Sequence, residues 1–190
     1  MLRWRFVTFE RTAMRLPSNR APRLLRNIFL ALAVLLPGMA LAEPSAIYLV
    51  RHGEKVSTGQ DPALTPQGQQ RAQNIATILH CTGIQAIFST PTARTLQTAQ
   101  PLAQQLGLKV EHYDPATPKA LVDKVRTLDG PVLVVGHSNT LPELVRLFGG
   151  APGADIADDE YGRLYQLTPA PGGAVRTVVL TSLPASASQP

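Results

Sequence analysis

The sequence lacks several features that would decide its class at once. It has a single cysteine, Cys81, so it cannot form an internal disulfide bond. It contains no internal repeat, no carboxylate cluster and no Cys/His spacing typical of a metal site, so we expect no bound metal ion. The 148 residues after position 42 must therefore be stabilised by a hydrophobic core, and they are enough for one domain.

The formal charge of +5 is unevenly distributed along the chain. Seven of the 18 basic residues lie within the first 42, with one of the 13 acidic residues. The remaining chain has 11 basic and 12 acidic residues and is nearly neutral. The basicity thus belongs to the N-terminal segment, and we expect no nucleic-acid partner for the rest of the protein.

The N-terminal 42 residues have the pattern of a secretory signal peptide. A basic segment precedes the apolar run Ile28–Leu36, which is well short of the ~20 residues of a membrane-spanning helix. Ala40 and Ala42 supply the small residues of a cleavage site, so we expect cleavage after Ala42 and an exported, periplasmic protein with no stable membrane anchor. An uncleaved anchor is the alternative. Met14 is the expected true start, because it gives a leader of ordinary length.

Strand and helix patterns alternate after the leader. Apolar or alternating runs predict strands at 46–50, 84–89, 108–113, 131–137, 164–167 and 175–180. Threonine-proline pairs predict helices that begin at Thr65-Pro66, Thr90-Pro91 and Thr117-Pro118, and another begins at Leu141. This alternation predicts a single α/β domain over residues 43–183, with a mostly parallel sheet flanked by helices on both faces. Residues 184–190 are expected to be a disordered tail.

Polar residues follow three of the predicted strands. These clusters are Arg51–Glu54, Ser89–Arg94 and Gly136–Thr140. Because ligands bind at the carboxyl ends of strands in open parallel sheets, we expect the three clusters to share one crevice.

The residue types in these clusters suit phosphoryl chemistry. Arg51 and Arg94 can form paired hydrogen bonds to phosphate oxygens. His52, if neutral, can attack phosphorus, and His137, if protonated, can stabilise the developing negative charge. A helix that begins after Thr90 would also direct backbone N–H groups toward an anion.

The same three clusters resemble the motifs of a known family. The stretch Leu49–Glu54 (LVRHGE), the block Ser89–Ala99 and the tripeptide Gly136–Ser138 are similar, in that order, to the sequence blocks of the histidine phosphatase superfamily. The resemblance runs from about Ala46 to Phe148. It implies a phosphoglycerate-mutase-like fold and a metal-free, cofactor-free phosphohydrolase or mutase.

The resemblance also implies roles for individual residues. His52 would be the phosphorylated nucleophile, and Arg51, Arg94 and His137 would form the phosphate pocket. The family pattern includes a leaving-group acid; Asp114 is our first candidate here, with Glu111, Glu54 or no acid as alternatives. Only 42 residues separate Arg94 from His137, which leaves no room for a large cap and predicts a shallow, open site.

The sequence therefore predicts an exported phosphatase that hydrolyses phosphomonoesters of small molecules or glycans. One alternative is a phosphate- or phosphoglycan-binding module of the same fold without activity. The other is a serine hydrolase, because Ser138 lies between a strand and a helix as in a nucleophile elbow. No histidine follows His137, however, so the usual triad order is not available.

Overall fold

The computed structural model describes residues 43–184. The predicted leader, its cleavage after Ala42 and residues 185–190 of the predicted tail lie outside the described residues. Within 43–184 the strands form one six-stranded sheet in the order β3-β2-β4-β1-β5-β6. The strands are β1 (Ile47–Arg51), β2 (Ala86–Ser89), β3 (Val110–His112), β4 (Val132–Gly136), β5 (Arg163–Pro169) and β6 (Val175–Thr181).

The sheet is mixed but mostly parallel, which confirms the predicted fold class. Strand β1 pairs in parallel with β4, and β2 pairs in parallel with both β4 and β3. Strand β5 runs antiparallel to β1, and β6 returns antiparallel to β5 as the predicted hairpin. Strand β3 forms one edge, as its alternating pattern predicted, and β1 and β4 lie at the centre.

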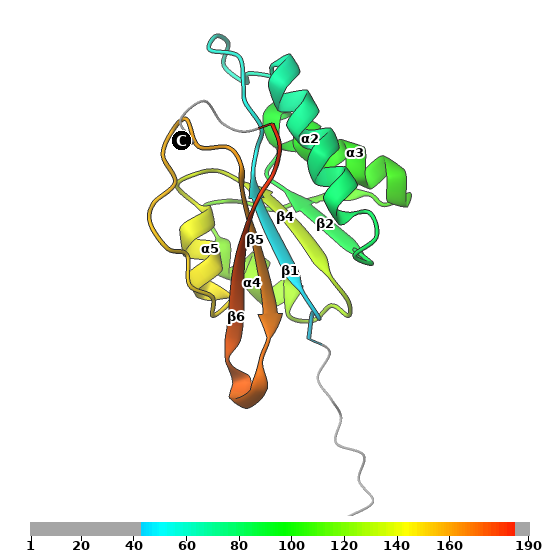
Figure 1. Cartoon of the computed structure of the whole chain (residues 1–190), viewed down its shortest axis with the longest axis vertical. Coiled ribbons are helices and arrows are strands. Elements are labelled where there is room, and N and C mark those ends of the chain that lie inside the picture. The colour runs from blue at the N-terminus through cyan, green and yellow to red at the C-terminus, as the bar shows by residue number, and fades with distance from the viewer. Residues whose placement is uncertain (1–42, 185–190) are drawn as a thin grey trace, which may run out of the picture. The chain divides into compact units, whose positions relative to one another are not determined.

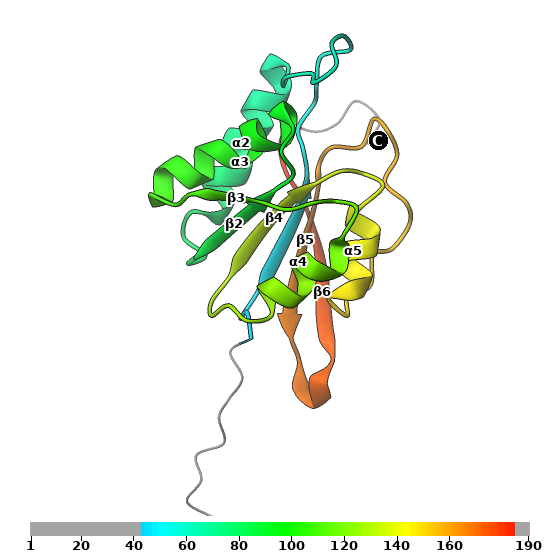
Figure 2. The same ribbon diagram turned by 180° about the vertical axis from the view of Figure 1, so that it is seen from behind.

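Helices cover both faces of the sheet. They are α2 (Pro66–Leu79), α3 (Ala93–Leu106), α4 (Pro118–Val125) and α5 (Leu141–Leu147), with a short 3-10 turn at Pro171–Gly173 between β5 and β6. Helices α2 and α3 pack on one face, and α4 and α5 pack on the other (Figures 1 and 2). No helix within residues 43–184 is long and apolar enough to cross a membrane.

The two central strands form the middle of the core. All five residues of β1 and all five of β4 are buried, because helices cover both sides. Successive side chains alternate between the faces: Leu49 and Val134 pack with α4 and α5, whereas Val50 and Val135 pack with α2 and α3. Full burial of each such side chain contributes about 1.5–3 kcal/mol before the entropy cost of folding. The site thus lies at the ends of the two strands whose residues are all buried.

The helix-start signals were correct at α2 and wrong at α3. Thr65 caps α2, accepting a hydrogen bond from the Gly68 N–H at 3.1 Å, as its Thr-Pro pair predicted. Helix α3 begins at Ala93 rather than after Thr90, and Thr92 before it has extended backbone angles. The Thr90 hydroxyl instead bonds to neighbouring side chains. The N-terminus of α3 therefore lies at Ala93 rather than at Pro91, two residues later than expected.

Candidate active site

Strand register brings the two histidines together. Arg51 pairs with Gly136 at the end of the β1–β4 ladder, and the His52 N–H donates to the Gly136 carbonyl at 3.0 Å. The His52 and His137 rings consequently lie 5.3 Å apart between centroids, at an angle of 66°. Strand β2 runs on the other side of β4 and ends beside it, which places Thr90 against His137.

The His52 ring is held in one tautomer. Its Nδ1 lies 2.8 Å from the Gly53 carbonyl oxygen, which can only accept, so Nδ1 carries the proton. The Nε2 lone pair is therefore free. Burial lowers the pKa of His52 to about 3, and the neighbouring His137 and the two arginines add to this effect. His52 is thus a neutral, oriented imidazole at physiological pH, as a nucleophile requires.

His137 is oriented by a threonine cluster. Its Nε2 lies 3.0 Å from the Thr90 hydroxyl, which lies 2.9 Å from the Thr95 hydroxyl. Burial, together with the charges of Arg94 and Arg51, lowers the pKa of His137 to about 4. Without a bound anion, His137 is therefore neutral near pH 7. Its expected protonated role requires a dianionic ligand, whose charge would raise the pKa of the imidazole again.

Both predicted phosphate-binding arginines have an unused donor. The Nε atoms of Arg51 and Arg94 are buried and have no hydrogen-bond partner within residues 43–184. Arg51 is only 4% exposed, and its Nη1 donates to the carbonyls of Ala157 and Glu160. Arg94 lies 3.7 Å from the Asp61 carboxylate through Nη1. Buried donors without partners are costly, and the charges of both arginines act on His52 and His137, so the four side chains lie close together.

The backbone that follows His52 is packed tightly against α2. The Gly53 N–H donates to the Thr98 hydroxyl at 3.0 Å, and the Glu54 carbonyl accepts from the Thr65 N–H at 2.8 Å. A Cβ atom on Gly53 would lie only 2.7 Å from the Gly68 carbonyl oxygen. A Cβ atom on Gly68 would in turn clash with the Glu54 carbonyl oxygen, so this close backbone approach requires glycine at positions 53 and 68.

A buried ion pair lies next to the site, between the segment after β1 and helix α2. Arg71 on α2 is fully buried and forms a two-point interaction with Glu54, at 2.6 and 3.0 Å. Its Nη1 also donates to the carbonyl of Ser182, at 2.8 Å, and to the Ser182 hydroxyl. Ser182 in turn donates its N–H and hydroxyl to the Gly162 carbonyl. The network joins the segment after β1 to the segment that enters β5.

The structure gives each of the three candidate acids another partner. Both Glu54 oxygens face Arg71, and Glu111 pairs with Lys124 on α4. Asp114 is exposed, and its Oδ1 accepts from the Ala116 N–H in the turn after β3. None of the three is brought into hydrogen-bond contact with His52 or His137 within the described residues. The role of Asp114 as leaving-group acid stays a prediction.

Sequence reasoning missed two residues beside the arginines. Tyr161 places its ring over the Arg51 guanidinium, 4.2 Å from Cζ to the ring centroid, and its centroid is 6.0 Å from that of His52. Asp61 accepts the Ala93 N–H at the start of α3 with both carboxylate oxygens. Both residues lie in segments that read as loops, and no local spacing rule connects them to the arginines.

The low pKa values predict a pH-dependent stability. An unfolded histidine has a pKa near 6.5, whereas folded His52 and His137 have pKa values of about 3 and 4. Between these values the unfolded chain binds protons that the folded chain does not. The free energy of unfolding should therefore fall as the pH drops from about 6.5 toward 4, by up to about 1.4 kcal/mol per pH unit for each imidazole. Above pH 6.5 this contribution is constant.

Urea unfolding of matched variants measures this contribution. His52→Gln and His137→Gln should each reduce the slope of the free energy of unfolding against pH. The reduction corresponds to at most one proton taken up on unfolding, because each variant lacks one titrating imidazole. Other acid-sensitive groups remain in all three proteins and cancel in the comparison. Identical slopes in the parent and both variants would show that the two imidazoles titrate normally in the folded domain.

Two other chemistries find less support in the geometry. No group of three or more His, Cys, Asp or Glu side chains within residues 43–184 is placed to hold a metal ion. The Ser138 hydroxyl has no imidazole partner in the described part of the chain, so a serine-hydrolase triad is not assembled. The described site is instead a pair of neutral imidazoles beside two arginines at the ends of parallel strands. That arrangement defines a class of α/β oxyanion sites suited to phosphate.

Sequence comparison finds a similarity to one family over part of the chain. Residues 47–115 match the histidine phosphatase superfamily (branch 1). The protein named "Probable phosphoglycerate mutase GpmB" from Citrobacter koseri is 33% identical over 104 residues, and the match covers 51% of this chain and 44% of the relative. Its counterpart in Cronobacter sakazakii is 32% identical over the same shares. The match thus spans less than half the length of these relatives.

Solved structures share the fold at low sequence identity. Mycobacterial glucosyl-3-phosphoglycerate phosphatase superimposes with a TM-score of 0.56 at 15% identity, covering 72% of this chain and 97% of the other. Phosphoserine phosphatase from Entamoeba histolytica, solved with 3-phosphoglyceric acid, gives a TM-score of 0.52 at 16% identity, with coverage of 74% and 97%. The family match over residues 47–115 and the three motif blocks in the same order make this chain similar to the histidine phosphatase superfamily.

Proposed function

We propose that this domain is a phosphatase that hydrolyses phosphomonoesters through a phosphohistidine intermediate on His52. One observation carries the proposal: a buried, neutral His52 with a free Nε2 lies in the same site as two buried arginine Nε atoms without partners in residues 43–184. The first group supplies a nucleophile, and the other two supply charge where phosphate oxygens would bind.

The proposed reaction has two displacements at phosphorus. In the first, the His52 Nε2 lone pair forms the N–P bond while the P–O bond to the leaving group breaks. The departing oxygen keeps that electron pair and takes a proton from an acid or from solvent. In the second, a water oxygen bonds to phosphorus, the N–P electron pair returns to Nε2, and the water proton passes to the base left by the acid. The products are an alcohol and inorganic phosphate.

The surrounding groups would act on charge rather than on bonds. Arg51 and Arg94 would bind the equatorial oxygens through donors that include their free Nε atoms. His137 would gain a proton as the dianion binds and would then donate a charge-assisted hydrogen bond. The hydrogen bond from Nδ1 to Gly53 would stabilise the positive charge that develops on the His52 ring during attack.

The leaving-group acid has its own test. If Asp114 donates the proton, Asp114→Asn should lower turnover of alkyl phosphates far more than that of aryl phosphates, because aryl oxides leave without protonation. Asp61→Asn is the matched comparison, since Asp61 bonds to the start of α3 beside Arg94. Equal losses on both substrate types in Asp114→Asn would move the role elsewhere.

Turnover and inhibition together test the proposed function. The protein should release phosphate from p-nitrophenyl phosphate, vanadate should inhibit it, and a serine-directed fluorophosphonate should not. Ser138→Ala should retain activity. Absence of turnover with intact phosphate binding would favour the non-catalytic module, and inhibition by the fluorophosphonate would favour the serine hydrolase.

We also propose that the protein is exported and that its substrates are periplasmic small-molecule or glycan phosphoesters. The basic and apolar leader and its Ala-Leu-Ala site support this proposal. N-terminal sequencing of the protein from a periplasmic fraction should begin at Glu43. An intact leader on membrane-bound protein would show that the segment is an anchor.

A further inference from the structure

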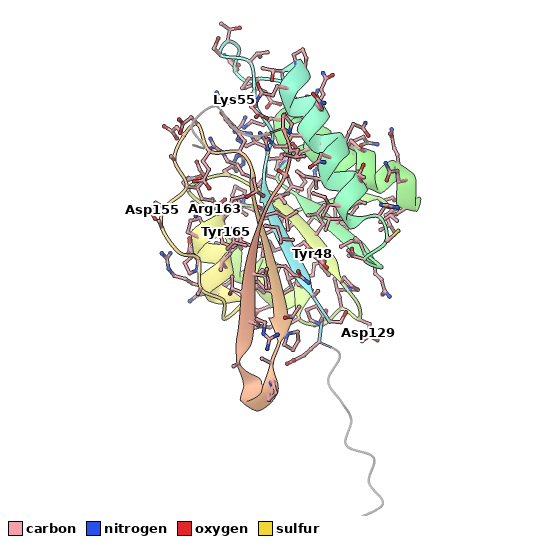
Figure 3. All side chains as sticks on the ribbon, in the orientation of Figure 1. Tyr48, Lys55, Asp129, Asp155, Arg163 and Tyr165 are labelled. Atoms are coloured by element: carbon pink, nitrogen blue, oxygen red, sulfur yellow. The ribbon has the colours of Figure 1, made fainter. Side chains whose placement is uncertain are left out.

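The loop between α5 and β5 is fixed to β5 by a dense set of hydrogen bonds. Arg163 on β5 donates to both Glu160 carboxylate oxygens, at 2.6 and 2.7 Å, and to the Ala154 carbonyl at 2.6 Å. The Tyr165 hydroxyl donates to the Pro152 carbonyl at 2.7 Å. Figure 3 shows Arg163 and Tyr165 beside this loop. Its residues lie outside the segment that matches the family profile, yet it is far from an unconstrained connection.

The anchored loop binds one side of the Arg51 guanidinium group through two hydrogen bonds. A turn joins the Glu160 N–H to the Ala157 carbonyl at 3.0 Å, and the carbonyls of Ala157 and Glu160 both accept from Arg51 Nη1. The distances from Arg51 Nη1 to these two carbonyl oxygens are 2.7 and 2.8 Å. Two carbonyls on one nitrogen fix the plane of the guanidinium group and leave Nε directed elsewhere, buried and without a partner in residues 43–184.

The face of the same guanidinium is covered by Tyr161. The ring lies 4.2 Å from Arg51 Cζ, within the range of a favourable cation–π contact. The main chain next to Tyr161 is held in place, because the Ser182 N–H donates to the Gly162 carbonyl at 2.7 Å. Arg71 holds Ser182 in turn. Arg51 is therefore restrained in its plane by two carbonyls and across its face by an aromatic ring.

We propose that the loop of residues 151–161 positions Arg51 for phosphate and that Tyr161 is its main positioning residue. A free arginine side chain loses rotamer entropy when it binds an anion, and a prefixed one has already lost it. Tyr161 acts through Arg51 and makes no chemical contribution of its own. The inference rests on the proposed function only in taking the site to bind a phosphate group, and it can be measured without turnover.

A double-mutant cycle on phosphate affinity tests the proposal. Calorimetry with inorganic phosphate should show binding weakened about tenfold in Tyr161→Leu, and Tyr161→Phe should restore most of the affinity because it keeps the ring. In an Arg51→Lys background, Tyr161→Leu should change affinity less than twofold, since no guanidinium remains to be positioned. Where turnover is measurable, kcat/KM should follow the same pattern.

Two results would overturn the proposal. An equal loss from Tyr161→Leu in both backgrounds would mean that Tyr161 supports the fold rather than Arg51. An unchanged phosphate affinity in Tyr161→Leu would mean that the ring positions nothing. Arg163→Gln provides a second route if Arg51→Lys does not fold: it releases the loop without touching Arg51, and it should weaken phosphate binding several-fold. Unchanged affinity in that variant would also contradict the proposal.

Discussion

Replacing His52 by asparagine is expected to lower kcat/KM for p-nitrophenyl phosphate by about 10⁴-fold or more, the scale seen when a covalent nucleophile is removed. The amide can keep a hydrogen bond to the Gly53 carbonyl that the His52 Nδ1–H makes now. It cannot attack phosphorus. Arg51, Arg94 and His137 remain, so phosphate should still bind and should still compete with other ligands for the site. The measurement is steady-state kinetics with calorimetric phosphate binding on the same preparations.

His112→Asn is the matched control for this change. His112 is an exposed residue at the end of the edge strand β3, so its replacement removes an imidazole without touching the site. Its activity should stay within about twofold of the parent, as for a surface substitution. A His52→Asn protein with near-parent turnover would eliminate His52 as the nucleophile.

Arg71→Met is expected to destabilise the domain by about 3–5 kcal/mol, because it leaves the Glu54 carboxylate largely buried without its cation. The Glu54 side chain is 13% exposed and Arg71 is fully buried, so water cannot replace the missing partner. The change also removes donors from the carbonyl and hydroxyl of Ser182, and with them the link between the segments after β1 and before β5. Urea denaturation at neutral pH gives the free energy of unfolding directly.

The exposed pair Lys124–Glu111 provides the comparison for Arg71. Its two side chains are 52% and 46% exposed, so water screens the interaction. Lys124→Met should therefore change the free energy of unfolding by less than about 1 kcal/mol. Similar effects for the two variants would show that the buried pair is not a main source of stability. Retained stability in Arg71→Met with lost activity would assign the pair to positioning alone.

Much of the site was visible in the sequence because it is built from strand ends. Arg51, His52 and His137 lie at the ends of apolar runs that were predicted to be buried central strands, and parallel pairing then places their side chains at one edge. The helix that contains Arg94 was predicted too, although its start was placed too early. Short apolar runs and Thr-Pro pairs are local patterns, so they can be interpreted without knowledge of tertiary contacts.

The remaining parts of the site depend on contacts between distant segments. Arg71 lies on the buried face of α2, where a pattern of apolar spacing gives no reason to expect a charge. Tyr161 follows an acidic stretch that reads as a solvated loop, yet the carbonyls of that loop bind Arg51. Main-chain acceptors have no sequence signature, so only the fold reveals them. The protonation of His137 was likewise invisible, because burial sets it.

The most direct test of the central claim is chemical trapping of the intermediate. Acid-free quenching of the protein during turnover of a ³²P-labelled phosphomonoester, followed by peptide mapping, should place the label on the peptide that contains His52. The bond should be acid-labile and base-stable, and His52→Asn should carry no label. Label on Ser138, or turnover with no labelled protein at any quench time while His52→Asn stays as active as the parent, would contradict the account.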